Sequence, residues 1–118
     1  MRIRVSDYIA NFLVENDITQ VFTVTGGGAM FLNDSFGHHK NISCIYNHHE
    51  QASAIAAEGY TKRFGKIAVV CVTSGPGATN AITGVVGAYQ DSIPMIIISG
   101  QAKSTLCLHL SLIHISEP

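Results

Sequence analysis

Two kinds of segment alternate along the chain, and they differ in how their hydrophobic residues are spaced. Short runs rich in apolar and β-branched residues, typical of buried strands, occupy residues 20–24, 42–46, 67–73 and 95–99. Longer segments with apolar residues at helical spacing occupy residues 6–15, 29–36, 49–64 and 78–90. This alternation predicts an α/β fold, with a three-layer parallel sheet that carries helices on both faces.

Local signals mark several of the element ends. Ser6 or Asp7 is available to cap the first helix, because short polar side chains accept hydrogen bonds from the free N–H groups of a first turn. Gly65 follows the third helix and suits the left-handed conformation that often ends helices. After the third strand, Pro76 presets φ for the second position of a turn, and Gly77 permits a positive φ at the third.

The last predicted helix, residues 78–90, contains no charged residue. One side of the helix carries large apolar residues, and another carries small residues. The apolar positions are Ile82, Val85, Val86 and Tyr89, and the small ones are Ala81, Gly84 and Ala88. A helix without a solvated face is buried on more than one side. We therefore expect it to contact another domain or subunit besides the sheet.

Composition narrows the class of protein. At 118 residues, with 47% hydrophobic and 13% charged residues, the chain can form one domain with a substantial core. The net charge of −1 and the lack of a basic cluster argue against binding to nucleic acid or to an anionic membrane. No apolar run approaches the length of a bilayer span, and no signal segment follows Met1, so we expect a soluble protein.

Neither the cysteines nor the histidine pairs predict a cross-link or a metal site. Cys44, Cys71 and Cys107 are odd in number and widely spaced, which suits small apolar residues in a reducing, cytoplasmic protein. Adjacent histidines rarely converge on one ion, and no third ligand follows His38-His39 or His48-His49 at zinc-like spacing. We expect His38-His39 to be a solvated helix end.

A candidate site lies where the second strand meets the third helix. Glu50 stands in the first helical turn, and ligands of open parallel sheets bind outside the carboxyl ends of the strands. The loop 73–80 should reach the same edge, where backbone N–H groups, Thr73 and Asn80 could hold a polar ring. The alternative is purely structural, because the helix dipole favours an acidic first turn and Gly-Pro-Gly is common in turns.

Longer motifs favour the functional interpretation. The run His49-Glu50-Gln51, followed by Ala-Ala-Glu-Gly-Tyr at 56–60, resembles the segment that carries the catalytic glutamate of thiamine-diphosphate enzymes of the acetolactate synthase type. The segments 73–80, 91–94 and 99–101 also resemble that family. The resemblance spans about residues 3–101 and implies the N-terminal, pyrimidine-binding domain, with a thiamine-diphosphate-binding, flavodoxin-like fold that is incomplete at the C-terminus.

The resemblance implies that Glu50 is the catalytic residue. It would hydrogen-bond to N1′ of the aminopyrimidine and relay protons, so that the cofactor attacks a 2-oxo acid such as pyruvate. Carbon dioxide then leaves, and the enamine is ligated to a second carbonyl compound. Besides Glu50, the residues implied to bind the cofactor are Thr25, Gly26, Gly27, His49, Thr73, Gly75, Pro76, Gly77 and Asn80. No metal ligand is expected in this chain.

Other implied features belong to parts that the chain lacks. In the family, a separate C-terminal domain binds the diphosphate and Mg²⁺ through a Gly-Asp-Gly…Asn-Asn segment, which has no match here. FAD is possible in the full-length enzyme, although nothing in this chain indicates it. The family encloses each cofactor between subunits, so we expect a homodimer or homotetramer and an inactive isolated fragment.

The sequence of the loop 25–28 leaves alternative functions open. The family usually has an aromatic residue and a proline before two glycines here, whereas this chain has Thr25 and Gly26. A 2-oxo acid decarboxylase, or a carboligase of sugar or polysaccharide metabolism, is therefore an alternative. Phe31 stands where a GxGxxG run from Gly26 needs glycine, and no GxxxxGK[ST] motif occurs. A non-catalytic, flavodoxin-like binding module is the alternative from another class.

The last residues of the chain are not assigned to the same domain as the rest. We assign residues 1–103 to a partial N-terminal pyrimidine-binding domain and leave 104–109 unassigned. Residues 110–118 resemble the translation of a transposase-end adapter used for sequencing libraries, so we predict that they are not native. An ordinary C-terminal strand, which 112–115 could form, is the alternative.

Overall fold

The structure, a computed structural model, describes residues 2–102, and these form an alternating series of helices and strands. In chain order the elements are α1 (Val5–Glu15), β1 (Gln20–Thr23), the 3₁₀ helix η1 (Gly27–Ala29), α2 (Met30–His38), β2 (Ser43–Tyr46), α3 (Glu50–Phe64), β3 (Val69–Val72), α4 (Pro76–Gln90) and β4 (Ile96–Ser99). Every strand and helix predicted from the sequence is present, with ends that differ by one or two residues. The predictions for residues 104–118 lie outside the described residues.

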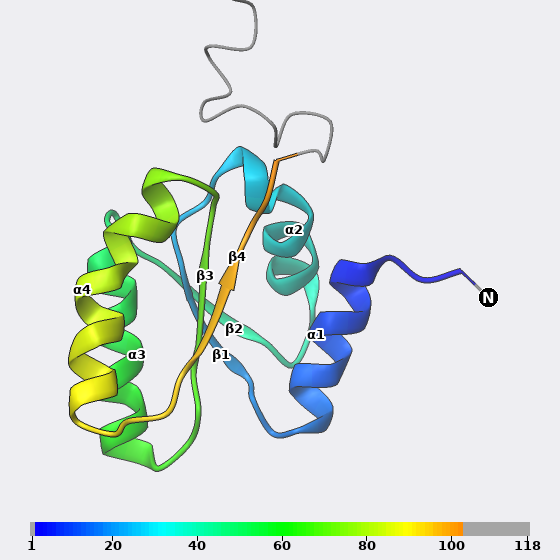
Figure 1. Cartoon of the computed structure of the whole chain (residues 1–118). Coiled ribbons are helices and arrows are strands. Elements are labelled where there is room, and N and C mark those ends of the chain that lie inside the picture. Colours follow the sequence, from blue (N-terminus) through cyan, green and yellow to red (C-terminus); the bar gives the residue numbers. More distant parts are fainter. Residues whose placement is uncertain (1, 103–118) are drawn as a thin grey trace, which may run out of the picture.

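The sheet is the middle of three layers (Figure 1). Its four strands are all parallel and lie in the order β2-β1-β3-β4. Helices α1 and α2 cover one face, and α3 and α4 cover the other. The carboxyl ends of the strands lie along one edge, at the top of Figure 1, where α2, α3 and α4 begin. The predicted fold class is confirmed.

The two hydrophobic cores arise from the two-residue periodicity of the strands. Val69 and Cys71 of β3 face the α1–α2 layer, whereas Val70 and Val72 face the α3–α4 layer. All four side chains are 0% exposed, as expected of a central parallel strand. Full burial of each valine contributes about 1.5–3 kcal/mol, so β3 supports both cores.

The start of α1 differs from the prediction. Its N-cap is Arg4, with no side-chain cap, and Ser6 lies inside the helix. Ser6 is buried, and its Oγ accepts a hydrogen bond at 2.8 Å from Oγ of Ser35 in α2. Asp7 accepts hydrogen bonds at 2.9 Å from the Arg4 guanidinium and at 2.6 Å from Oγ of Ser35. Both predicted caps were wrong because each side chain has a tertiary partner instead.

The start of α4 also differs in its detail. The positive φ belongs to Gly75, at 63°, and Pro76 occupies the first helical positions, where its missing N–H has no consequence. Gly77 is therefore helical and buried, not the third residue of a turn. At the C-terminal end of the preceding helix, α3, Gly65 has a φ of 67° and its N–H donates to the Thr61 carbonyl, so the predicted left-handed cap of α3 is confirmed.

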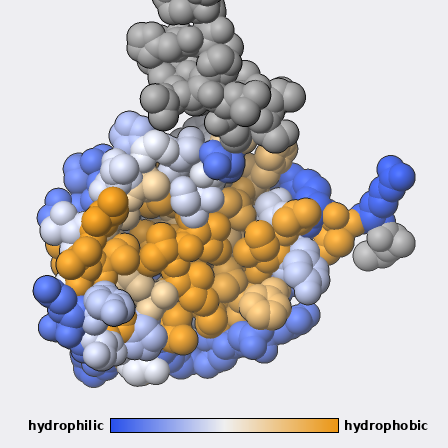
Figure 2. Space-filling model, in the orientation of Figure 1, coloured by the Kyte–Doolittle hydropathy of each residue, from blue (hydrophilic) through white to orange (hydrophobic). Residues whose placement is uncertain are grey.

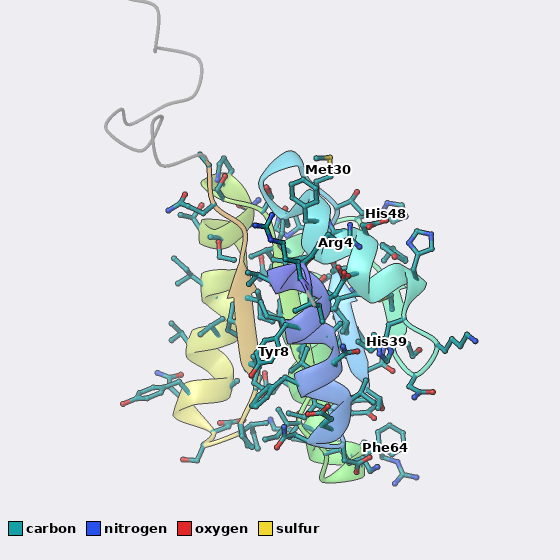
Figure 3. All side chains as sticks on the ribbon, turned by 90° about the vertical axis from the view of Figure 1, so that its right-hand side faces the viewer. Arg4, Tyr8, Met30, His39, His48 and Phe64 are labelled. Carbon is teal, nitrogen blue, oxygen red and sulfur yellow. The ribbon has the colours of Figure 1, made fainter. Side chains whose placement is uncertain are left out.

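An apolar face extends over α4, β4 and α1 (Figure 2). Ile97 of the edge strand β4 is 38% exposed, and Val86 of α4 is 48% exposed. Tyr8, which lies on the side of α1 next to β4, is also exposed (Figure 3). The outward side of α4 is thus the apolar one, while Ala81, Gly84 and Ala88 face inward. Of the helices described, none combines the length and the hydropathy that a bilayer span requires.

Candidate functional site

The loop between β2 and α3 places Glu50 at the carboxyl edge of the sheet. The backbone N–H of Asn47 donates to the Thr23 carbonyl at 2.8 Å, and its side-chain amide donates to Ser53 Oγ at 3.0 Å. His49 caps α3, because its Nδ1 accepts a hydrogen bond from the Gln51 N–H at 3.1 Å. These bonds fix the first turn of α3, in which Glu50 is the first residue.

Thr73 holds the neighbouring loops together. Its Oγ1 accepts a hydrogen bond from the Gly28 N–H at 3.0 Å. A Cβ atom added to Gly26 would lie 2.5 Å from the Thr73 Cβ, and one added to Gly77 would lie 2.7 Å from its Cγ2. At Gly26 an added side chain would need the backbone to move, because a Cβ cannot rotate away, and at Gly77 it would displace the Thr73 side chain. The β1–α2 loop and the start of α4 therefore need glycine to approach Thr73 this closely.

The Glu50 side chain contacts the first two turns of α4. The side-chain amide of Asn80 donates to Oε2 of Glu50 at 3.0 Å. A Cβ atom at Gly77 would lie 3.5 Å from Oε1, so this glycine leaves the second oxygen uncovered by a side chain. Among residues 2–102, no protein donor bonds to Oε1. The predicted proximity of Glu50 and the Gly75-Pro76-Gly77 segment is confirmed.

The structure brings together about half of the predicted site residues. Five form one continuous set of contacts, namely Gly26, Glu50, Thr73, Gly77 and Asn80. The others lie at the exposed rim of the same edge, and these are Thr25, Gly27, His49, Gly75 and Pro76. The role of His49 as a helix cap accounts for its position without a ligand. Contact between the cofactor and any of the ten residues stays a prediction.

Sequence reasoning did not select Gly28 and Gly100. A Cβ atom at Gly100 would lie 2.3 Å from the Gly28 carbonyl oxygen, and the Gln101 N–H donates to that oxygen at 3.2 Å. The strand end of β4 thus packs on the β1–α2 loop. The sequence signal for this close contact was glycine near the end of two predicted strands. Gly100 directly follows the strand at 95–99, and the glycines at 26–28 come after the strand at 20–24.

A second polar cluster ties α1 to α2 away from this edge. Arg4, labelled in Figure 3, donates to carboxylate oxygens of Asp7 and Asp34 at 2.9 Å each. Hydrogen bonds from Arg4 and from Ser35 lower the pKa of Asp7 to about 2. The Arg4–Asp34 and Ser35–Asp7 hydrogen bonds join α2 to the start of α1. Nearby, the His38 side chain is 85% exposed, which confirms the expected solvated helix end for this residue.

Comparison with known proteins shows the family. A model of the N-terminal TPP-binding domain of thiamine pyrophosphate enzymes matches residues 3–114. The chain therefore belongs to the thiamine pyrophosphate enzyme family, within this N-terminal domain. The match includes residues 110–114 of the segment that we predict to be adapter-derived, so the native end stays a prediction.

Acetolactate synthases of several organisms are similar to this chain. The large subunit of Buchnera aphidicola subsp. Schizaphis graminum is 45% identical over 101 residues, and the isozyme 3 large subunit of Escherichia coli K12 is 40% identical over 101 residues. Each alignment covers 86% of this chain but only 18% of the relative. The chloroplastic acetolactate synthase of Arabidopsis thaliana is 35% identical over 96 residues, which are 81% of this chain and 14% of that protein.

A solved structure has the same fold. A Mycobacterium smegmatis protein described as a thiamin diphosphate-dependent enzyme superposes with a TM-score of 0.83 over 92% of this chain and 20% of its own. At 24% sequence identity, this likeness concerns the fold alone.

Proposed function

We propose that the full-length protein uses thiamine diphosphate to decarboxylate a 2-oxo acid such as pyruvate and to ligate the product to a second carbonyl compound, as an acetolactate synthase does. One observation carries the proposal: a glutamate at the carboxyl edge of a parallel sheet is held by α4 through one oxygen while the other oxygen has no protein donor. The similarity to acetolactate synthase large subunits supports the reaction class.

The residues at this edge fit the aminopyrimidine part of the cofactor. A pyrimidine with ring and amino nitrogens needs a carboxylate partner and a close backbone approach, and Glu50 and Gly77 offer both. Thr73 would hold the lining loops in place, and Gly26 would form part of the wall. When bound, thiamine diphosphate supplies the carbanion-stabilising chemistry. Glu50 would hold and move a proton at N1′ of the ring.

Several components of the activity would come from outside the described residues. Mg²⁺ and the diphosphate would be bound by a further domain, and an FAD requirement has no supporting observation in this chain. We propose a homodimer or homotetramer, and an isolated fragment without activity. A cytoplasmic location agrees with the free thiols of Cys44 and Cys71.

The test is Glu50→Gln in the full-length protein, because it removes the proton relay and leaves the side-chain shape. We expect kcat with pyruvate to fall by about 10²–10⁴-fold, as for loss of a general acid–base group, at an unchanged melting temperature. The matched control is Glu15→Gln, an exposed glutamate at the end of α1, which should keep full activity. Full activity of Glu50→Gln would exclude the proposed role.

The second candidate is a decarboxylase or a sugar or polysaccharide carboligase of the same family. It is favoured by Thr25 and Gly26, which depart from the pattern of acetolactate synthases in the loop that borders the reacting end of the cofactor. Product analysis separates the two: 2-acetolactate from pyruvate supports the first candidate, and free acetaldehyde or another ligated sugar supports the second. A non-catalytic module is disfavoured by membership of an enzyme family.

A further inference from the structure

Helices α3 and α4 run in parallel and in register from the carboxyl edge of the sheet (Figure 1). Near their starts, Asn80 hydrogen-bonds to Glu50. Four residues further along both helices, Gly84 lies against Ala54. The register is therefore set by backbone packing, since no long side chain separates the helices at this level.

The Asn80 amide has one partner in the described structure. It donates to Oε2 of Glu50 at 3.0 Å, although the asparagine itself is exposed. A glutamate side chain at a helix start has three rotatable bonds and many orientations open to it. A bond from a neighbouring helix selects one of them, and it points Oε1 past Gly77.

We infer that Asn80 is a positioning residue that acts through Glu50, and not a residue that binds the cofactor. This inference rests on the proposed function of Glu50. Asn80 holds Oε2 so that Oε1 is presented to the ligand before binding, and this preorganisation favours proton transfer in the bound state. A residue that bound the cofactor directly would instead be needed mainly for affinity.

The experiment uses the full-length protein with Asn80→Ala, Asn80→Asp and Asn80→Gln. It measures the exchange of the C2 proton of bound thiamine diphosphate with deuterium, and the Kd of the cofactor by calorimetry. Loss of a hydrogen bond to a charged group should slow the exchange about tenfold in Asn80→Ala, with a Kd within about threefold of the parent. Asn80→Asp should slow exchange further, because two carboxylates then face each other. Asn80→Gln keeps a donor and should restore part of the rate.

The matched control is Asn41→Ala, an exposed asparagine in the turn before β2 whose side chain makes no hydrogen bond in the described structure. It should leave both quantities unchanged. Glu50→Gln is measured alongside. If Glu50→Gln exchanges at the parent rate, the proposed function itself fails. If Glu50→Gln is slow but Asn80→Ala is normal, or if Asn80→Ala loses affinity more than exchange rate, only the positioning role is overturned.

Discussion

Gly84 of α4 packs directly on Ala54 of α3. A Cβ atom at position 84 would lie 2.5 Å from the Ala54 Cβ and 3.1 Å from the Ile55 backbone nitrogen. Neither neighbour can rotate out of the way, because one is a Cβ and the other is backbone. A larger residue at position 84 must therefore push the two helices apart.

Gly84→Ala should destabilise the full-length protein by about 1–3 kcal/mol, the usual cost of overpacking a tight core. The matched control is Gly59→Ala in α3, where a Cβ atom meets nothing within 4 Å. That variant should gain about 0.5–1 kcal/mol, because alanine favours a helix over glycine. Thermal or urea unfolding measures both. Equal stability of the two variants would contradict the packing described for Gly84.

A second prediction concerns the buried thiol of Cys71. Burial raises its pKa to about 11, and burial also raises the pKa of the half-buried Cys44. The thiolate is the reactive form, so a raised pKa leaves the thiol protonated and slow to alkylate near about pH 8. We expect iodoacetamide to spare Cys71 in the native protein and to label it after unfolding in guanidinium, as read by peptide mass spectrometry. Rapid native labelling at neutral pH would refute this.

The placement of the site could be predicted from the sequence, because it follows from topology. Continuous apolar runs indicated parallel strands, and parallel strands bring their carboxyl ends to one edge. That rule alone placed Glu50 beside the Gly75-Pro76-Gly77 segment, and the structure confirms it.

The contacts within the site could not be predicted, because they depend on distances between helices. Asn80 reaches Glu50 only because α3 and α4 approach closely at Ala54 and Gly84. The glycine with positive φ was also misassigned, to Gly77 instead of Gly75. Pro76 stands between two glycines, and local turn preferences allow a positive φ at either of them. Because the proline occupies the start of α4, the glycine before it takes the positive φ.

The outward face of the α3–α4 layer is apolar and uncharged over much of its length. No charged residue occurs at 51–57 or in α4. Ile55 of α3 is 50% exposed, and Ile82 and Val86 of α4 are 53% and 48% exposed. The helix at 78–90, now seen as α4, was predicted from the sequence to contact another domain or subunit. Exposed apolar surface of this kind normally marks an interface.

We therefore expect the full-length protein to sediment as a dimer or tetramer at micromolar concentration, with this face in the contact. Val86→Lys should weaken the assembly, because a charge would be buried at the interface without a partner. The control is Ile45→Lys, which also places a lysine at an apolar position, 44% exposed, but lies in β2 at the sheet edge opposite β4. It should leave the sedimentation coefficient unchanged. An active monomer, or a Val86→Lys variant that assembles like the parent, would show that this face is not the contact.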